Sequence, residues 1–230
     1  MAPASKLIRI FLGREPIGAE NRIQLRKSGA VFFVRGTMDV WSVKETWLDQ
    51  FYQKCGFTID PDWTVMDIGA GIGEFTLFAG RQARRVIAFE PYRPSYAYLE
   101  KNIAANQAVT VEAHPIAVAS FTGDLVLDLS GGEPLQIQSG NTSLQAAGLQ
   151  NRVACKSLAD IFKEYAVERC SLMKLDCEGA EYDILFGTPP EVLARIDRVV
   201  MEYHDEVTSY SHKDLARFLE QQGYEVEVFA

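Results

Sequence analysis

Residues 65–76, Val-Met-Asp-Ile-Gly-Ala-Gly-Ile-Gly-Glu-Phe-Thr, restrict the possible folds of this chain more than any other stretch. A short apolar run that contains Asp67 leads into alternate glycines at 69, 71 and 73, and a helix-compatible segment follows directly. This order predicts a buried strand, a tight turn and a helix. Alternate glycines permit positive φ and let a ligand lie against the main chain. A nicotinamide-type fingerprint needs a sixth-position glycine, where this chain has Glu74, so a nicotinamide-dependent oxidoreductase is disfavoured.

Glu90 marks the tip of a second predicted strand, because it follows the apolar run 86–89. A carboxylate at that point can accept hydrogen bonds from both hydroxyls of a ribose. Acids after two successive strands, Asp67 and Glu90, are stronger evidence for such a ligand than glycines alone. The alternative is that Glu90 simply ends a strand at the protein surface.

The rest of the chain alternates apolar runs with helix-like periodicity, which predicts an α/β fold built from strand–helix units. The predicted strands are 31–34 with a hairpin partner near 23–25, 65–68, 86–89, 109–118 with a bend at Pro115, 123–130, 135–137, 152–156, 170–176, 198–203 and 224–228. The predicted helices are 39–52, 74–79, 94–107, 157–165, a segment that ends at 186, and 212–222. We interpret residues 1–62 as an N-terminal hairpin and helix cap, and residues 63–230 as a cofactor-binding core.

Charge and composition exclude several partners. The formal net charge is −8, which repels a phosphate backbone and argues against nucleic acid bound by bulk electrostatics. No apolar run approaches the length of a membrane span, and the N-terminal apolar segment is too short for a secretory signal. The four cysteines lack paired metal-ligand spacing. We therefore expect buried free thiols and a cytoplasmic protein.

The segment Met173-Lys174-Leu175-Asp176-Cys177-Glu178-Gly179-Ala180-Glu181 resembles the signature of the FkbM family of methyltransferases. The resemblance extends from about residue 35 to residue 224. It implies a class I methyltransferase fold, with a Rossmann-like, mostly parallel sheet, one antiparallel strand and helices on both faces. It also implies S-adenosylmethionine as cofactor, a hydroxyl group as the usual methyl acceptor, and acceptors that include macrocycles and sugars. One departure is that only 224–228 remains as a candidate for the two antiparallel strands that usually close this fold.

The resemblance also assigns the cofactor site. The residues that it predicts to bind S-adenosylmethionine are Asp67, Gly69, Ala70, Gly71, Gly73, Glu74, Phe75, Thr76, Glu90, Pro91, Tyr92, Ala117 and Asp176. We predict that no metal ion assists, because the acids show no spacing specific for metal ligands.

A hydroxyl becomes a good nucleophile only when a base removes its proton. His204, just past the fifth core strand, is the predicted base, with a pKa near about 6.5. Asp176 and Glu178 are the alternative catalytic residues, and the structural alternative is a neutral His204 that hydrogen-bonds a loop carbonyl. The residues predicted to contact the acceptor are Arg35, Asp39, Asn141, Thr142, Ser143, Glu181 and Glu202. For Arg35 and Asp39 the alternative is an ion pair that stabilises the fold.

Two functions from different classes are compatible with these residues. The first is an S-adenosylmethionine-dependent O-methyltransferase, acting on a small molecule or a sugar. The second is a non-catalytic module that binds S-adenosylmethionine. The acids gathered around the expected methyl group favour the enzyme, since a module without turnover has less need of them.

Overall fold

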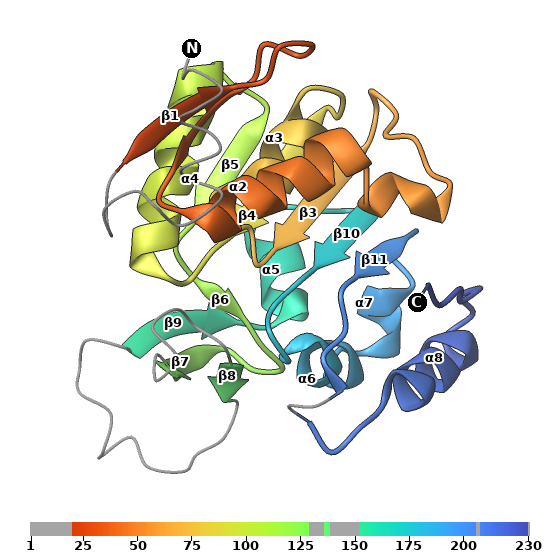
Figure 1. Cartoon of the computed structure of the whole chain (residues 1–230). Helices are drawn as coiled ribbons and strands as arrows, with labels where there is room; N and C mark the ends of the chain where they lie inside the picture. Colours follow the sequence, from red (N-terminus) through yellow and green to blue (C-terminus); the bar gives the residue numbers. More distant parts are fainter. Residues whose placement is uncertain (1–19, 129–135, 139–151, 206–207, 230) are drawn as a thin grey trace.

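The computed structural model describes residues 20–128, 136–138, 152–205 and 208–229. Its central sheet has five strands in the order β11-β10-β3-β4-β5, and every pairing between them is parallel (Figure 1). The strands are β3 (Thr64–Ile68), β4 (Arg85–Phe89), β5 (Val111–His114), β10 (Leu172–Leu175) and β11 (Val199–Met201). A mostly parallel α/β core is therefore confirmed.

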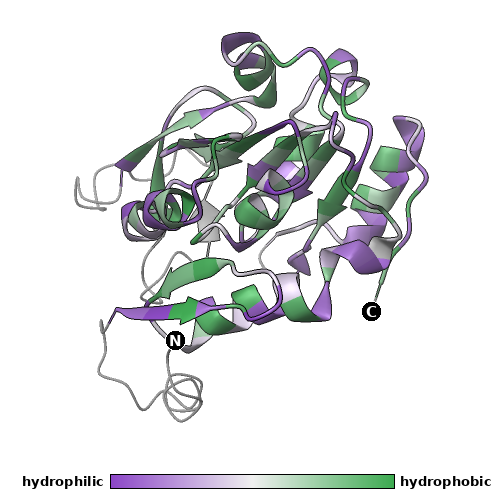
Figure 2. Ribbon diagram, turned by 90° about the horizontal axis from the view of Figure 1, so that it is seen from above, coloured by the Kyte–Doolittle hydropathy of each residue, from purple (hydrophilic) through white to green (hydrophobic). Residues whose placement is uncertain are grey.

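Side-chain alternation along these strands builds a core on each face of the sheet. On one face Met66, Ile87 and Met173 pack against α5 (Leu158–Glu164), α6 (Glu181–Phe186), α7 (Pro190–Leu193) and α8 (His212–Gln221). On the other face Val65 and Val86 pack against α3 (Glu74–Gly80), and α4 (Arg93–Asn106) lies beside it. Figure 2 shows the resulting hydrophobic strands between helices of mixed hydropathy. Helices on both faces are thus present, as predicted.

The N-terminal segment forms the predicted hairpin, from β1 (Asn21–Gln24) and β2 (Val31–Val34). The single helix predicted over 39–52 is wrong. The segment instead forms α2 (Thr37–Lys44), the π-helical turn η1 (Glu45–Asp49) and the 3₁₀ turn η2 (Tyr52–Cys55), because Gln50 takes a left-handed conformation with φ +52°. The hairpin and α2 share one apolar cluster with the glycine-turn residue Ile72 and with Leu77 of α3.

A second sheet, in the order β6-β9-β7-β8, lies near the carboxyl ends of the central strands (Figure 1). It contains β6 (Ala117–Val118), β7 (Gly123–Asp128), β8 (Gln136–Gln138) and β9 (Arg152–Lys156). The predicted β7–β8 hairpin is confirmed. The single strand predicted over 109–118 is split instead into β5 and β6, which belong to different sheets, and the proline at 115 falls in the break.

The strand predicted over 224–228 is absent, so the described part of the central sheet has no antiparallel strand. Tyr224 and Val226 instead pack on the core, and the Tyr224 hydroxyl donates to the carbonyls of Leu193 and Ile196. Three cysteines, 155, 170 and 177, are buried free thiols as predicted. Among the described helices, none combines the length and apolar composition that crossing a bilayer requires.

Candidate active site

The glycine turn between β3 and α3 forms the floor of the candidate site. Gly69, Gly71 and Gly73 have φ values of +75°, +55° and +92°, a region that side-chain-bearing residues seldom adopt. A Cβ on Gly69 would lie 1.8 Å from the Asp176 carbonyl oxygen, whereas a Cβ on Gly71 would meet only the Glu74 carboxylate, at 3.6 Å. Gly69 is therefore required for packing inside the protein, and Gly71 faces space that a ligand can use.

Glu90, directly after β4, lies against this turn rather than at the surface. Its carboxylate accepts hydrogen bonds from the backbone N–H groups of Gly71 and Tyr92, each at 2.8 Å. Burial raises the pKa of Glu90 to about 7. These two hydrogen bonds hold the carboxylate at the edge of the glycine turn.

Lys174 of β10 is the cation at the centre of the site, and its side chain is buried. Its ammonium donates to the Gly69 carbonyl at 2.7 Å and lies 3.3 Å from Asp67 and 3.5 Å from Asp176. Although burial lowers the pKa of an ammonium, these carboxylates raise the pKa of Lys174 well above its usual value. Lys174 is therefore paired with the two acids that lie on either side of it. Asp67 also accepts from the Thr76 hydroxyl, so this acid organises the turn from inside the protein.

Glu74, the first residue of α3, is a buried acid with an unfilled acceptor. Its side chain lies next to Gly71, and its Oε2 is buried without a hydrogen-bond partner among the described residues. Burial raises the pKa of Glu74 to about 8, a larger effect than the opposing attraction of Lys174. A buried oxygen without a partner costs stability, so the Oε2 of Glu74 is available to a hydrogen-bond donor that is not among the described residues.

The cap segment brings two aromatic residues to the site, and the sequence pattern does not indicate this role for either of them. The indole N–H of Trp47, in η1, donates to the Glu74 backbone carbonyl at 2.9 Å. The Tyr52 hydroxyl lies 3.4 Å from an Asp176 carboxylate oxygen, and its ring packs edge-on against Phe75. Helical spacing marks both aromatic residues as apolar packing positions, and nothing local indicates that their polar atoms reach the site.

His204 lies between two carboxylates at the carboxyl end of β11. Its Nδ1 is 3.5 Å from Glu181, and its Nε2 is 3.6 Å from Glu178. The Glu181 carboxylate, followed by the charge of Glu178, raises the pKa of His204 to about 9 despite the opposite effect of burial. The value near 6.5 expected from the sequence is therefore too low, because it omitted this acidic surrounding.

Glu181 was predicted to contact the acceptor, but its side chain is fully buried. Its two oxygens accept from the backbone N–H groups of Cys177 and Gly179, at 2.6 and 2.9 Å. Glu181 therefore stabilises the turn between β10 and α6, and its buried carboxylate lies beside the His204 ring. Glu178, with φ +52°, and Glu202 are exposed beside it.

Asp176, Glu178 and His204 offer ligand atoms that lie within 4.8 Å of one another. Oxygen and imidazole ligands at such separations are compatible with a divalent ion. The absence of a metal stays a prediction.

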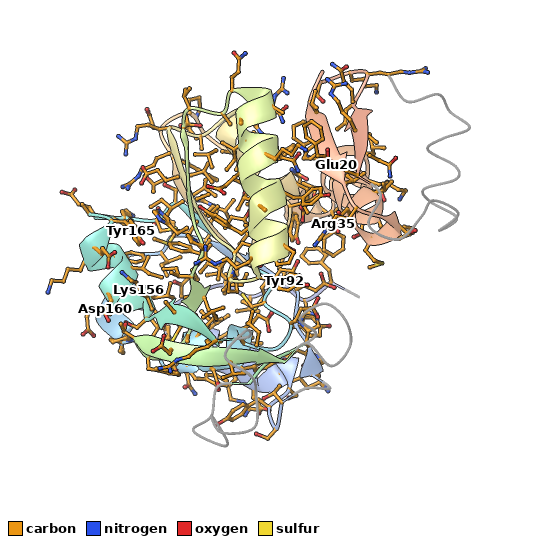
Figure 3. The ribbon with its side chains drawn as sticks, turned by 90° about the vertical axis from the view of Figure 1, so that its left-hand side faces the viewer. Glu20, Arg35, Tyr92, Lys156, Asp160 and Tyr165 are labelled. Atoms are coloured by element: carbon orange, nitrogen blue, oxygen red, sulfur yellow. The ribbon has the colours of Figure 1, made fainter. Side chains whose placement is uncertain are left out.

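The other predicted residues fall into four groups. Arg35 and Asp39 form a two-point ion pair beside α4, and Arg35 also donates to Ser95 (Figure 3). This geometry supports the fold-stabilising alternative for the pair. The side chains of Phe75 and Ala117 are buried in apolar clusters, so only their backbone atoms are open to a cofactor. Ala70, Pro91 and Tyr92 border the turn, whereas residues 141–143 lie outside the described residues.

A parallel sheet with a glycine turn and acids at its carboxyl edge defines a class of nucleotide-cofactor proteins that includes methyltransferases. The model of the methyltransferase FkbM domain matches residues 67–226, and the chain belongs to the FkbM family of methyltransferases.

Two relatives and one solved structure illustrate the similarity. The chain is 28% identical over 224 residues to the AMB antimetabolite synthetase AmbE of Pseudomonas aeruginosa, a match that covers 80% of this chain and 10% of AmbE. It is 28% identical over 190 residues to the 31-O-demethyl-FK506 methyltransferase FkbM of Streptomyces tacrolimicus, covering 70% of this chain and 73% of that protein. A crystal structure of the methyltransferase FkbM from Methylobacillus flagellatus superposes with a TM-score of 0.46 at 14% identity, covering 72% and 43% of the two chains.

Proposed function

We propose that this protein is an S-adenosylmethionine-dependent O-methyltransferase that acts on a hydroxyl of a small molecule or sugar. The observation that carries the proposal is the acidic cradle at the carboxyl edge of the sheet, with Glu74 and Glu90 beside an open Gly71 and with His204 nearby. The relative named as a 31-O-demethyl-FK506 methyltransferase supports oxygen as the methyl acceptor.

The residues of the cradle fit the proposed cofactor. Glu90 has carboxylate lone pairs for a ribose diol, and Gly71 leaves space beside it for the ligand. The unpaired Oε2 of Glu74 suits a cationic donor. Among the described residues of the cradle, Lys174 is the one cation beside four acids, Asp67, Glu74, Glu90 and Asp176. This excess of acids favours a ligand that carries positive charge.

When bound, S-adenosylmethionine supplies an electrophilic methyl group on a sulfonium that is already a good leaving group. The chain must therefore position the acceptor hydroxyl and remove its proton, and positioning alone is worth roughly 7 to 11 kcal/mol in favourable systems. In our proposal His204 takes that proton once it has lost its own, while Glu181 holds the imidazole ring and Asp176 or Glu178 accepts a hydrogen bond from the acceptor. Because the pKa of His204 is about 9, this reaction is favoured by alkaline pH.

The test begins with calorimetry of the full chain with S-adenosylmethionine and S-adenosylhomocysteine. We expect micromolar binding of both, and no binding of NAD. A panel of hydroxylated metabolites and sugars is then screened for S-adenosylhomocysteine release. The control is His204→Gln, which we expect to bind the cofactor normally but to turn over about 10²- to 10⁴-fold more slowly. Binding without release on any acceptor would favour a non-catalytic module, and no binding would reject the cofactor.

A further inference from the structure

We propose that Glu74 is the receptor for the ammonium group of the cofactor, and that it gives up a proton when the cofactor binds. This inference rests on the proposed function, since it requires S-adenosylmethionine or its product in the cradle. It goes further by assigning one buried side chain to one charged group of the ligand.

The position of Glu74 carries the assignment. The residue is only 9% exposed, its Oε2 has no partner among the described residues, and both carboxylate oxygens would lie within 3.7 Å of a Cβ on Gly71. Gly71 is also the residue whose N–H is held by Glu90, the expected ribose acceptor. A ligand whose ribose lies at Glu90 and whose chain crosses Gly71 would therefore bring its other end to Glu74.

The chemistry of the unfilled oxygen selects the ammonium over the sulfonium. A buried carboxylate oxygen requires an N–H or O–H donor, and an ammonium offers three N–H groups whereas a sulfonium offers none. The adenine and ribose are neutral. Of the positively charged groups on the cofactor, only the ammonium can satisfy the Oε2 of Glu74.

The groups around Glu74 explain why its charge depends on the ligand. Lys174 on β10 attracts its negative charge, whereas Asp67 on β3 and Asp176 after β10 repel it. Glu74 is in turn one of the charges that raise the pKa of Tyr52 on η2. Lys174 is already shared between Asp67, Asp176 and the Gly69 carbonyl. The nearest cation is thus committed elsewhere, and burial keeps the pKa of Glu74 at about 8 in the free protein.

Proton linkage gives a readout that does not depend on turnover. At pH 7, below that pKa, most of Glu74 carries a proton in the free protein, and pairing with an ammonium removes it. Titration calorimetry at pH 7 in buffers of different ionisation enthalpy therefore measures the protons released per ligand bound. We expect Glu74→Gln to release fewer protons than the wild type, by an amount that shrinks as the pH is raised above 8, whereas Glu100→Gln, an exposed acid on α4, should match the wild type. Protons that the ligand itself releases cancel in the difference between variant and wild type, because the same ligands are used with each protein.

Three ligands distinguish the possible causes of proton release in the wild-type protein, without any mutation. S-adenosylmethionine and S-adenosylhomocysteine both carry the ammonium and should release the proton, whereas 5′-methylthioadenosine lacks the amino acid and should not. Release with S-adenosylmethionine alone would overturn the ammonium assignment, and equal release with all three ligands would overturn a charge-based role. If Glu74→Gln releases as many protons as the wild type, the assignment of the proton to Glu74 is also overturned. If the wild type binds neither of the first two ligands, the proposed cofactor itself is rejected and this inference with it.

Discussion

Substitution by alanine should have different effects at Gly71 and at Gly69. At Gly71 it should mainly weaken cofactor binding, and at Gly69 it should mainly destabilise the fold. At Gly71, the added methyl group meets only the Glu74 carboxylate, at ordinary contact distances of 3.6 and 3.7 Å. The left-handed backbone there costs about 1 to 2 kcal/mol for a residue with a Cβ. A loss of that size lowers the Tm of a chain of this length by roughly 2 to 8 °C. The methyl group would occupy the open face of the turn, so we expect cofactor affinity to fall at least about 100-fold, or roughly 2.7 kcal/mol.

At Gly69 the same methyl group would lie 1.8 Å from the Asp176 carbonyl oxygen and 2.8 Å from its carbonyl carbon. A non-bonded contact between the methyl carbon and the carbonyl group needs about 3.5 Å. The end of β3 and the turn after β10 would therefore have to move apart by roughly 1 Å or more. Such a displacement breaks the packing of two neighbouring core strands, and we expect a loss above about 4 kcal/mol. That loss corresponds to a Tm at least roughly 8 °C lower.

Thermal unfolding followed by circular dichroism, combined with calorimetry of S-adenosylmethionine binding, distinguishes the two variants. Gly71→Ala should stay folded and lose the ligand, whereas Gly69→Ala should lose stability first. Equal stability of the two variants, or wild-type affinity in Gly71→Ala, would refute this interpretation of the turn.

Four other substitutions test the charged groups. Lys174→Met should destabilise the protein by about 3 to 5 kcal/mol in urea unfolding, because it leaves Asp67 buried without its cation, and adding Asp67→Asn should recover part of the loss. Glu90→Ala should weaken cofactor binding by roughly 2 to 3 kcal/mol in calorimetry, and a change below about 0.5 kcal/mol would place the ribose elsewhere. For His204, the deprotonated ring is the active base, so kcat/KM should rise with pH up to about 9, and His204→Gln should abolish this dependence. A wild-type profile that is flat between pH 7 and 9 would exclude His204 as the base.

The strand–turn–helix units were predictable because their signals are local. An apolar run, a glycine turn and an amphipathic segment each depend on residues a few positions apart, and the parallel arrangement then brings Glu90 and Lys174 to one edge. Lys174 and Asp176 are two positions apart along a single strand, so local alternation alone puts both side chains on the same face of the sheet. These predictions required no knowledge of how distant segments pack.

The errors arose where tertiary contacts decide the outcome. Residues 224–228 alternate like a strand, yet Tyr224 and Val226 satisfy that alternation by packing on the core without a strand partner. The helix over 39–52 breaks at Gln50, where a non-glycine residue adopts positive φ and no local signal marks it. Glu181 was predicted to contact the acceptor, but its side chain is buried and accepts hydrogen bonds from the backbone of the preceding turn. The raised pKa of His204 depends on the same Glu181 carboxylate, which lies beside the imidazole only in the folded chain.

The side-chain amides of α4 connect the hairpin to the cofactor turn. Asn102 accepts from the Phe33 N–H and donates to the carbonyls of Phe33 and Ile72, while Asn106 pairs in the same way with Val31. The edge of β2 is thus bonded to a helix as if to another strand, and one of these amides also holds the glycine turn. Because Asn102 bonds both segments, opening of the hairpin and loosening of the glycine turn break hydrogen bonds to the same side chain. A ligand that tightens the turn should slow amide hydrogen exchange at residues 31 and 33, which makes these two N–H groups remote reporters of cofactor occupancy.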